Sequence, residues 1–344
     1  MTRDSSMFDV LVDPGTGTVA SIAGQAESVG FDAVCLGETN HDPLVLLAAA
    51  SQATNDIALT TSILVAFARS PMVTATAAND VQALAAGRLR LGLGSQVRAH
   101  ITRRFAMPWS RPAARMREYV QALHAIWDSW ENGSQLSFEG EFYSHTLMTP
   151  MFDPGPNPFG RPPVLVAGVG GGMSKVAGEV ADGFQVHSFV TEKYLTEVIL
   201  PNIDEGLALS GRTRADLEIC VTPMLATGTT GDEIARAREH VRGQIAFYGS
   251  TPSYKGVLDV HGWGGVHEKL YELAKVRRWD AMSELIGDDM VAEFAVVGTL
   301  DEAAAELDRR WGPLSDRIGV SAQTMDDLEA WRPVLTALSE PCVM

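Results

Sequence analysis

The sequence has few cysteines, few basic residues and no long apolar run, and each shortage excludes a class of protein. The cysteines Cys35, Cys220 and Cys342 are scattered over 344 residues without a Cys-x-x-Cys spacing, so neither a disulfide framework nor a zinc site is indicated. No apolar run reaches the roughly 18 residues of a membrane span, and the first residues lack the apolar core of a signal peptide. We therefore expect a cytoplasmic protein with no membrane partner.

Basic residues are outnumbered, with 27 Lys and Arg against 43 Asp and Glu, for a formal net charge of −16. The summed field of such a surface repels nucleic acid and anionic lipid. An anionic cofactor is not excluded, because backbone N–H groups act at short range, where distant charge is screened. We expect no nucleic-acid partner and a small-molecule substrate.

Short β-prone runs alternate with amphipathic helical stretches, the pattern of parallel strands joined by crossover helices. The pattern predicts strands at 8–12, 33–36, 57–65, 88–94, 163–169, 182–188, 217–226 and 317–321, and helices at 19–29, 43–54, 71–86, 111–131, 173–181, 192–210, 232–248 and 326–338. One more helix begins near Thr299, the expected N-cap, with Glu302 at the capping-box spacing. Eight β-runs favour a closed (β/α)₈ TIM barrel, and a doubly wound open sheet is the alternative.

We expect one domain over residues 1–344, since hydrophobic residues make up 46% of the chain and can form a full core. Two insertions interrupt the alternation. The segment near 133–162 predicts a β-hairpin and then a Pro-rich irregular stretch, and the segment near 249–293 decorates one end of the sheet.

The candidate site residues follow the strands, because a barrel of this type builds its site at the carboxyl ends. The run LGETNHDP ends the second strand and contains Glu38, Thr39, Asn40 and His41. His41 could transfer a proton near neutral pH, with Glu38 orienting it or binding a cofactor. Helix capping by Asn40 or Asp42 is the plainer interpretation.

Two glycine-containing turns follow later strands. In LGLGSQVRAH, Gly94 lets a ligand approach the backbone, Ser95 and Gln96 offer hydrogen bonds, and His100 follows. After the fifth strand, a turn comes directly before a helix, where free N–H groups could hold a phosphate; it contains Gly168, Val169, Gly170, Gly171 and Gly172. A turn that needs glycine only for tight geometry is the alternative.

Other histidines give a weaker signal. Only His187, which closes the sixth predicted strand, is well placed for the barrel mouth, and no His-x-x-x-His spacing with a carboxylate suggests a metal site. Trp109, Trp263 and Tyr248 could cover an apolar substrate, although single aromatic residues usually belong to the core.

Together, TTSIL, AGRLRLGLGSQ, RPAARMREYVQALHAIWDSW, FEGEFYSH and ADGF resemble the luciferase-like monooxygenase superfamily over nearly the whole chain. The segments AMPWSRPAARMREY, HTLMTPMFDPGP and QIAFYGSTPSY look like an actinobacterial branch grouped with deazaflavin-dependent oxidoreductases. The resemblance implies a non-prolyl cis peptide at Ser62 and Ile63 behind the deazaflavin ring of coenzyme F420. It also implies phosphate contacts at Gly94, Ser95 and Gln96 and at the turn 168–172.

The resemblance predicts an F420-dependent oxidoreductase that moves a hydride to or from a small organic molecule. Sugar-phosphate dehydrogenases of the superfamily have Asp-His after the second strand and Gly-Glu after the fourth, whereas this chain has Glu38-Thr39 and Gln96-Val97. A sugar phosphate is therefore disfavoured, and His41, Glu38 and His100 are the candidate catalytic residues. An FMN-dependent monooxygenase and a non-catalytic cofactor-binding barrel are the alternatives. We also expect a homodimer and a separate F420 or flavin reductase that supplies the reduced cofactor.

Overall fold

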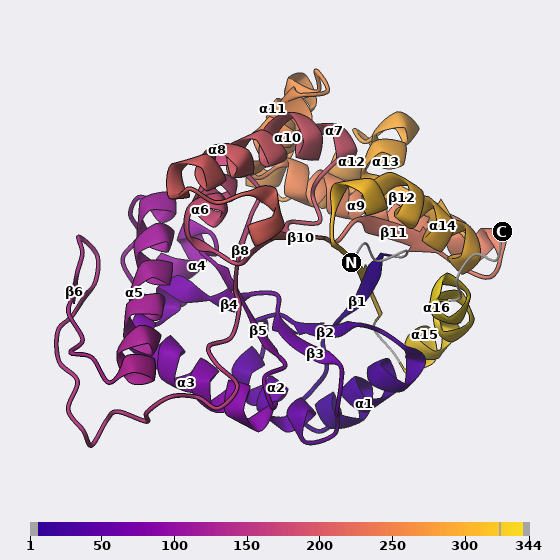
Figure 1. Ribbon diagram of the computed structural model, residues 1–344. Coiled ribbons are helices and arrows are strands. Elements are labelled where there is room, and N and C mark those ends of the chain that lie inside the picture. Colours follow the sequence, from indigo (N-terminus) through magenta and orange to yellow (C-terminus); the bar gives the residue numbers. More distant parts are fainter. Residues whose placement is uncertain (1–5, 323–324, 340–344) are drawn as a thin grey trace.

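The β-prone runs lie side by side as a parallel sheet that closes into a barrel (Figure 1). The structure is a computed structural model that describes residues 6–322 and 325–339. In these residues, eight strand positions follow one another around the barrel in the order β3, β2, β1, β13, β10, β9, β8 and β5, and pairing of β3 with β5 closes it. The strands are β1 (Met7–Val12), β2 (Ala33–Leu36), β3 (Ala58–Thr61), β5 (Leu89–Gly94), β8 (Val164–Gly168), β9 (Gly183–Val186), β10 (Glu218–Val221) and β13 (Arg317–Ser321).

Helices connect the strands and surround the barrel (Figure 1). They are α1 (Val19–Val29), α2 (Pro43–Ser51), α3 (Pro71–Leu84), α4 (Arg98–Arg103), α5 (Pro112–Asn132), α6 (Gly171–Val180), α7 (Glu192–Tyr194), α8 (Leu200–Ser210), α9 (Gly231–Gly249), α14 (Leu300–Trp311), α15 (Met325–Ala330) and α16 (Arg332–Ser339). The TIM-barrel prediction is confirmed. No helix within the described ranges is long and apolar enough to cross a membrane.

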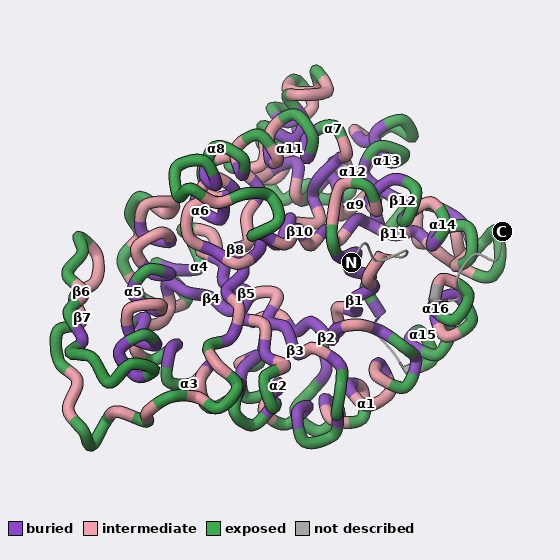
Figure 2. Tube along the Cα trace, in the orientation of Figure 1, coloured by how far each residue is buried: buried purple, intermediate pink, exposed green. Residues whose placement is uncertain are grey.

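The burial pattern explains the layering. All four residues of β2 are buried, as expected for a strand covered by a helix on one face and by the barrel interior on the other. Figure 2 shows the buried strands inside a ring whose outer surface is exposed.

Capping side chains mark where two helices begin. Asp42 accepts a hydrogen bond from the Leu44 N–H at the start of α2, and the predicted capping box of Thr299 and Glu302 is present at the start of α14.

The third predicted strand is interrupted. β3 ends at Thr61, the Ser62–Ile63 peptide bond is cis, and a short strand β4 (Leu64–Val65) pairs with the end of β5. The Ser62 N–H donates to the Leu36 carbonyl, and the Glu38 N–H donates to the Ile63 carbonyl. The cis bond therefore lies at the position that the resemblance predicted.

The seventh predicted strand, 217–226, is wrong as one strand. β10 ends at Val221, and a separate strand β11 (Met224–Thr227) leaves the barrel to pair with β12 (Ala295–Gly298), which was not predicted. Pro223 stands between β10 and β11 and has no N–H, so it cannot donate a ladder hydrogen bond.

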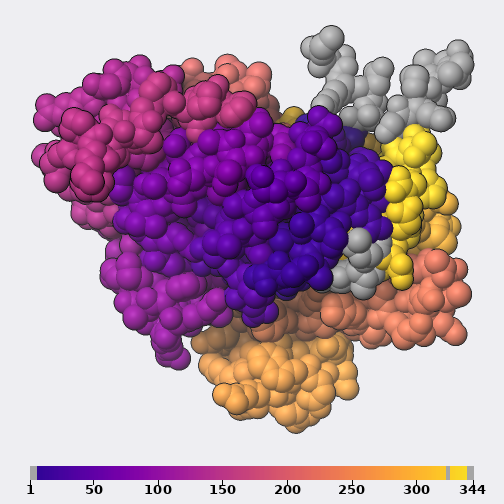
Figure 3. Space-filling view, turned by 90° about the horizontal axis from the view of Figure 1, so that it is seen from below, coloured from indigo at the N-terminus to yellow at the C-terminus, as the bar shows by residue number. Residues whose placement is uncertain are grey.

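Both predicted insertions have recognisable structures. β6 (Phe138–Glu139) and β7 (Ser144–His145) form the expected hairpin, and the Pro-rich stretch after them has no helix or strand. The Glu118 carboxylate on α5 accepts from the N–H groups of Glu141, Phe142 and Tyr143. The second insertion contains α10 (Lys255–Asp259), α11 (Gly264–Lys275), α12 (Trp279–Ser283) and α13 (Asp288–Phe294), and Figure 3 shows this orange segment protruding from the indigo body.

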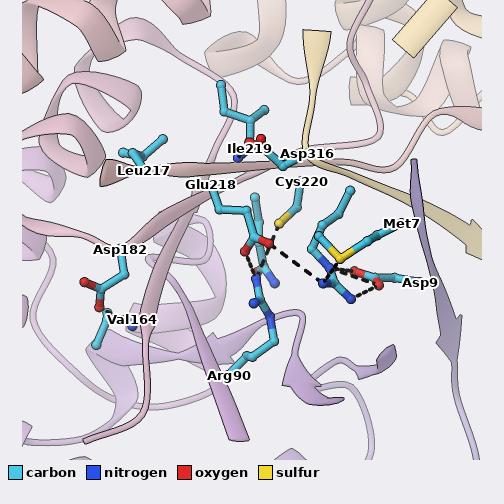
Figure 4. Close-up of polar contacts among 12 residues, drawn as sticks. Met7, Asp9, Arg90, Val164, Asp182, Leu217, Glu218, Ile219, Cys220 and Asp316 are labelled. Atoms are coloured by element: carbon cyan, nitrogen blue, oxygen red, sulfur yellow. Dashed lines mark hydrogen bonds and ion pairs between the residues drawn. The ribbon is translucent and has the colours of Figure 1, made fainter. Parts of the chain in front are cut away.

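The barrel interior contains a buried network of charged side chains (Figure 4). The Arg317 Nε atom donates to both carboxylate oxygens of Asp9, and Arg90 pairs with Glu218. Arg90 also contacts the Cys220 thiol, at 3.8 Å. Burial raises the pKa values of the Cys220 and Cys35 thiols, and both cysteines are free. Cys342 lies outside the described residues.

Candidate functional site

The predicted site residues lie at or just after the carboxyl ends of β2, β3, β5 and β8, the edge where barrel enzymes place their chemistry. Two close approaches connect the first three of these ends. A Cβ atom on Gly37 would lie 3.1 Å from the Ser62 carbonyl oxygen, and one on Gly94 would lie 2.7 Å from Cδ1 of Ile63. Glycine at both positions therefore lets the strand ends approach the Ser62–Ile63 segment.

Glu38 is held in a structural ion pair. Its Oε2 atom accepts from the Val65 N–H at 2.8 Å and from Arg69 Nη1 at 2.6 Å, and its side chain is only 8% exposed. Arg69 also donates to Asp42 at 2.7 Å, and the two carboxylates raise the pKa of the guanidinium against the effect of burial. Glu38 thus fixes β4 to the end of β2, and its role beside a cofactor ring stays a prediction.

The two candidate histidines lie on exposed segments. His41 stands in the loop after β2, and His100 stands on α4. Arg104 at the end of α4 donates to the Thr39 carbonyl at 2.6 Å, which ties α4 to that loop, and the Thr39 hydroxyl bonds Asp13 at 3.0 Å. Both imidazoles are accessible to a ligand, and their proton-transfer role stays a prediction.

Ser95 and Gln96 form a local turn. Gln96 has a left-handed backbone (φ 57°), and its Oε1 atom accepts from the Val97 N–H at 2.9 Å. The Ser95 hydroxyl donates to the Gln96 carbonyl at 3.2 Å. These two side chains shape the loop after β5, and a cofactor contact from either would compete with these bonds.

The glycine-rich turn combines two roles. A Cβ on Gly168 would lie 2.7 Å from Cβ and Cγ of Met173, so packing requires glycine there, and one on Gly171 would lie 2.6 Å from Nδ2 of Asn202, whose amide would have to move. Gly170 caps α6, and nothing lies within 4 Å of a Cβ there, while Gly172 and the buried Val169 complete the turn. Tight geometry thus explains Gly168 and Gly171, and the open approach at Gly170 suits an anion at the start of α6.

His187 follows β9 and is flanked by aromatic rings. The centroids of Tyr248 and Tyr254 each lie 4.9 Å from that of the imidazole. Nδ1 of His187 accepts from the Phe189 N–H at 3.0 Å, and burial lowers the pKa of the imidazole to about 4. The sequence placed His187 at the mouth by its position after the strand and named Tyr248 as a possible cover for an apolar substrate, but it did not bring the two together or single out Tyr254, which follows the end of α9.

The other predicted aromatic residues differ in their surroundings. Trp263 stacks on His261 with ring centroids 4.4 Å apart, and the Thr191 hydroxyl and His261 Nε2 are 2.8 Å apart. Trp109 packs edge-on against Phe67 beside α3. Trp263 therefore belongs to the insertion that borders the mouth near His187, and Trp109 belongs to a different cluster.

Comparison with known proteins agrees with this geometry. The profile of the luciferase-like monooxygenase family matches residues 8–314. The chain is 46% identical to the uncharacterized protein Rv1360 of Mycobacterium tuberculosis, over 94% of this chain and 92% of that protein. It is 33% identical to an F420-dependent glucose-6-phosphate dehydrogenase of Beutenbergia cavernae, over 68% and 70% of the two chains.

Two solved structures share the fold. The coenzyme F420-dependent tetrahydromethanopterin reductase of Methanopyrus kandleri superposes with a TM-score of 0.77 at 19% identity, over 96% of this chain and 98% of that one. The oxygenating constituent of 3,6-diketocamphane monooxygenase of Pseudomonas putida, in complex with FMN, superposes with a TM-score of 0.65 at 18% identity, over 98% and 97%.

Proposed function

Because the chain belongs to the luciferase-like monooxygenase family, we propose that it is an F420-dependent oxidoreductase that transfers a hydride between coenzyme F420 and a small organic substrate. The observation that carries the proposal is the glycine-lined mouth, with Gly94 against Ile63 on one side and Gly170 open at the start of α6 on the other. The choice of F420 over other flavins is supported by the relatives whose names include that coenzyme.

The residues present fit a flat ring with an anionic tail. Ser62, Ile63 and Gly94 would support the ring, and the free N–H groups at Gly170 to Gly172 would hold a phosphate, with the α6 dipole adding to the attraction. Negative net charge does not oppose this contact, because surface charges beyond about 10 Å are screened at ordinary ionic strength.

When bound, a deazaflavin supplies two-electron hydride chemistry. The chain's own part is to hold the mouth rigid and to control protons. Glu38 and Arg69 fix β4 behind the ring position, and His41 and His100 stay the candidates for proton transfer. Hydride transfer needs a substrate beside the ring, and the aromatic side of the mouth at His187 offers that surface.

A fluorescence titration of the purified apoprotein with F420 and with FMN, at matched ionic strength, tests the proposal. Micromolar or tighter binding of F420 with weaker binding of FMN is expected. A Gly170→Glu variant should weaken F420 binding, because a carboxylate would occupy the anion site, and Gly231→Glu at the start of α9 is the matched control. Preference for FMN would contradict the proposal.

The rival is an FMN-dependent monooxygenase, which the fold likeness to the FMN-bound oxygenase favours. Stoichiometric oxygen consumption during turnover would support the rival, and anaerobic turnover would exclude it. Tight cofactor binding without turnover over a broad substrate panel would instead indicate a non-catalytic binding barrel. We also propose a homodimer and a separate reductase that recycles the cofactor, which light scattering and a coupled assay with an F420 reductase would test.

A further inference from the structure

His187 is the residue that follows β9, and its side chain lies on the inner face of the barrel. Gln185, two residues earlier, points inward, where its Nε2 atom donates to the Thr61 carbonyl at 3.2 Å. The His187 N–H donates to the Gly168 carbonyl at 3.3 Å, so the ladder with β8 continues to residue 187. Because side chains alternate along a strand, residues 185 and 187 share a face. His187 therefore projects over the mouth, beside the first glycine of the α6 turn.

One ring nitrogen of His187 already accepts a hydrogen bond, and the other has no partner among the described residues. Nδ1 accepts from the Phe189 N–H, so in the neutral ring Nε2 carries the proton. Within residues 6–322 and 325–339, no acceptor bonds that Nε2–H, and the Nε2 atom is not completely enclosed. The structure thus holds a fixed donor whose hydrogen bond is unused.

The surroundings of the donor are aromatic and uncharged. Tyr248 lies edge-on to the imidazole and Tyr254 is tilted against it, and Phe189 stacks on Phe294 behind them, with ring centroids 4.6 Å apart. Burial alone accounts for the lowered pKa of His187, with no contribution from any Asp, Glu, Lys or Arg of the described chain. The nearby ammonium groups are engaged elsewhere, Lys193 with the Val260 carbonyl and Lys255 with Asp259.

We infer that His187 donates a hydrogen bond from Nε2 to an oxygen of an uncharged substrate whose apolar body lies against Tyr248 and Tyr254. The inference rests on the proposed function and names the substrate class: a small ketone, or the alcohol formed from it. Reduction of the ketone adds a hydride to carbon, with reduced F420 as the reductant, and a proton from solvent to oxygen. A neutral donor fixed at that oxygen stabilises the charge that develops there.

The substrate class follows from the chemistry of the Tyr248 and Tyr254 rings beside His187. A phosphate or carboxylate on the substrate would lose hydration here without gaining a cation, which is costly. A carbonyl oxygen needs only one donor, and a flat apolar body gains contact with the rings. An uncharged ketone is therefore bound better than its charged counterpart.

Histidine-labelled protein tests the inference without any cofactor. In ¹H–¹⁵N spectra at pH 7.5, His187, assigned with His187→Phe, should show the Nε2–H tautomer. Acetophenone and cyclohexanone should shift its Nε2 resonance, and 4-acetylbenzoate, which adds only a carboxylate to acetophenone, should bind about tenfold more weakly or worse. An unmoved Nε2 resonance with both ketones, or tighter binding of 4-acetylbenzoate, would overturn the inference.

Kinetics with F420 gives the second readout. His187→Phe keeps a ring but loses the donor, so kcat/KM for ketone reduction should fall about 100-fold, while the Kd for F420 stays within about threefold. His187→Gln restores a donor and should recover part of the loss, and the exposed His240→Phe on α9 is the matched control. Equal loss in the Phe and Gln variants would contradict the donor role.

The two proposals fail separately. If F420 does not bind but ketones shift the His187 resonance, the proposed function is wrong and the donor site stands. If F420 binds and the resonance does not respond, only the further inference is wrong.

Discussion

Gly94 and Ile63 are in contact only because residue 94 has no side chain. A Cβ atom at 94 would lie 2.7 Å from Cδ1 and 2.8 Å from Cγ1 of Ile63, closer than side-chain carbons approach one another. The end of β5 and the start of β4 therefore form one continuous surface at the barrel mouth, and any side chain at 94 would separate them.

Gly94→Ala should lower the free energy of unfolding by about 1–3 kcal/mol through overpacking and should weaken cofactor binding. Gly170→Ala is the matched control, since its Cβ meets no atom within 4 Å and should change stability by less than about 0.5 kcal/mol. Urea unfolding of both variants measures the difference. Equal stability of the two would show that the mouth relaxes freely around residue 94.

Arg69→Met should destabilise the protein by about 3 kcal/mol, because the nearly enclosed Glu38 carboxylate would lose its ion-pair partner. Combining it with Glu38→Gln should recover most of the loss, since the amide oxygen can still accept from the Val65 N–H. Arg309→Met, which breaks an exposed pair with Glu306, should cost less than about 1 kcal/mol. Additive effects of the first two changes in urea unfolding would argue against the ion pair.

The pKa of His187 predicts a loss of stability in acid. Burial lowers this pKa from 6.5 to about 4 in the folded chain, so the unfolded chain binds the proton more tightly. The contribution is complete above about pH 6.5, falls as the pH drops towards 4, and amounts to at most about 3 kcal/mol. The unfolding free energy of the wild type should therefore fall more steeply over this range than that of His187→Phe. Parallel profiles would contradict the prediction.

Glu118→Ala should release the β6–β7 hairpin from α5, because one carboxylate accepts three backbone N–H groups of residues 141–143. Hydrogen exchange of these amides should accelerate about tenfold or more, while exchange in the barrel strands stays unchanged. Glu131→Ala, an exposed residue of the same helix, is the control. Unchanged exchange at 141–143 would mean that other contacts hold the hairpin.

The barrel was predictable from sequence because each strand carries its own local signal. Buried runs such as 33–36, and the capping box at Thr299, come from periodicity and helix-start chemistry that neighbouring residues determine. β10 and β11 were joined in the prediction because the apolar run continues through Pro223. Their separation depends on β12, about 70 residues later, whose pairing no local pattern reveals.

The sequence predicted the location of the candidate site better than it predicted the contacts of its side chains. The glycine turns and the Ser62–Ile63 segment lie at one edge of the barrel, as the strand-end rule requires. The sequence suggested that Glu38 orients His41 or binds a cofactor, whereas its pairing with Arg69 depends on a contact 31 residues away. Likewise, the rings beside His187 come from a segment some 60 residues later in the chain.

The reactivity of the two thiols inside the barrel reports how the barrel opens. Only a thiolate reacts with iodoacetamide, and burial raises the pKa of both Cys35 and Cys220, so alkylation should be slow until the barrel opens. The cysteines stand on β2 and β10, in different halves of the chain. Equal alkylation rates, followed residue by residue in a mass spectrometer, would mean that the barrel opens as one unit, and unequal rates would show which half opens first.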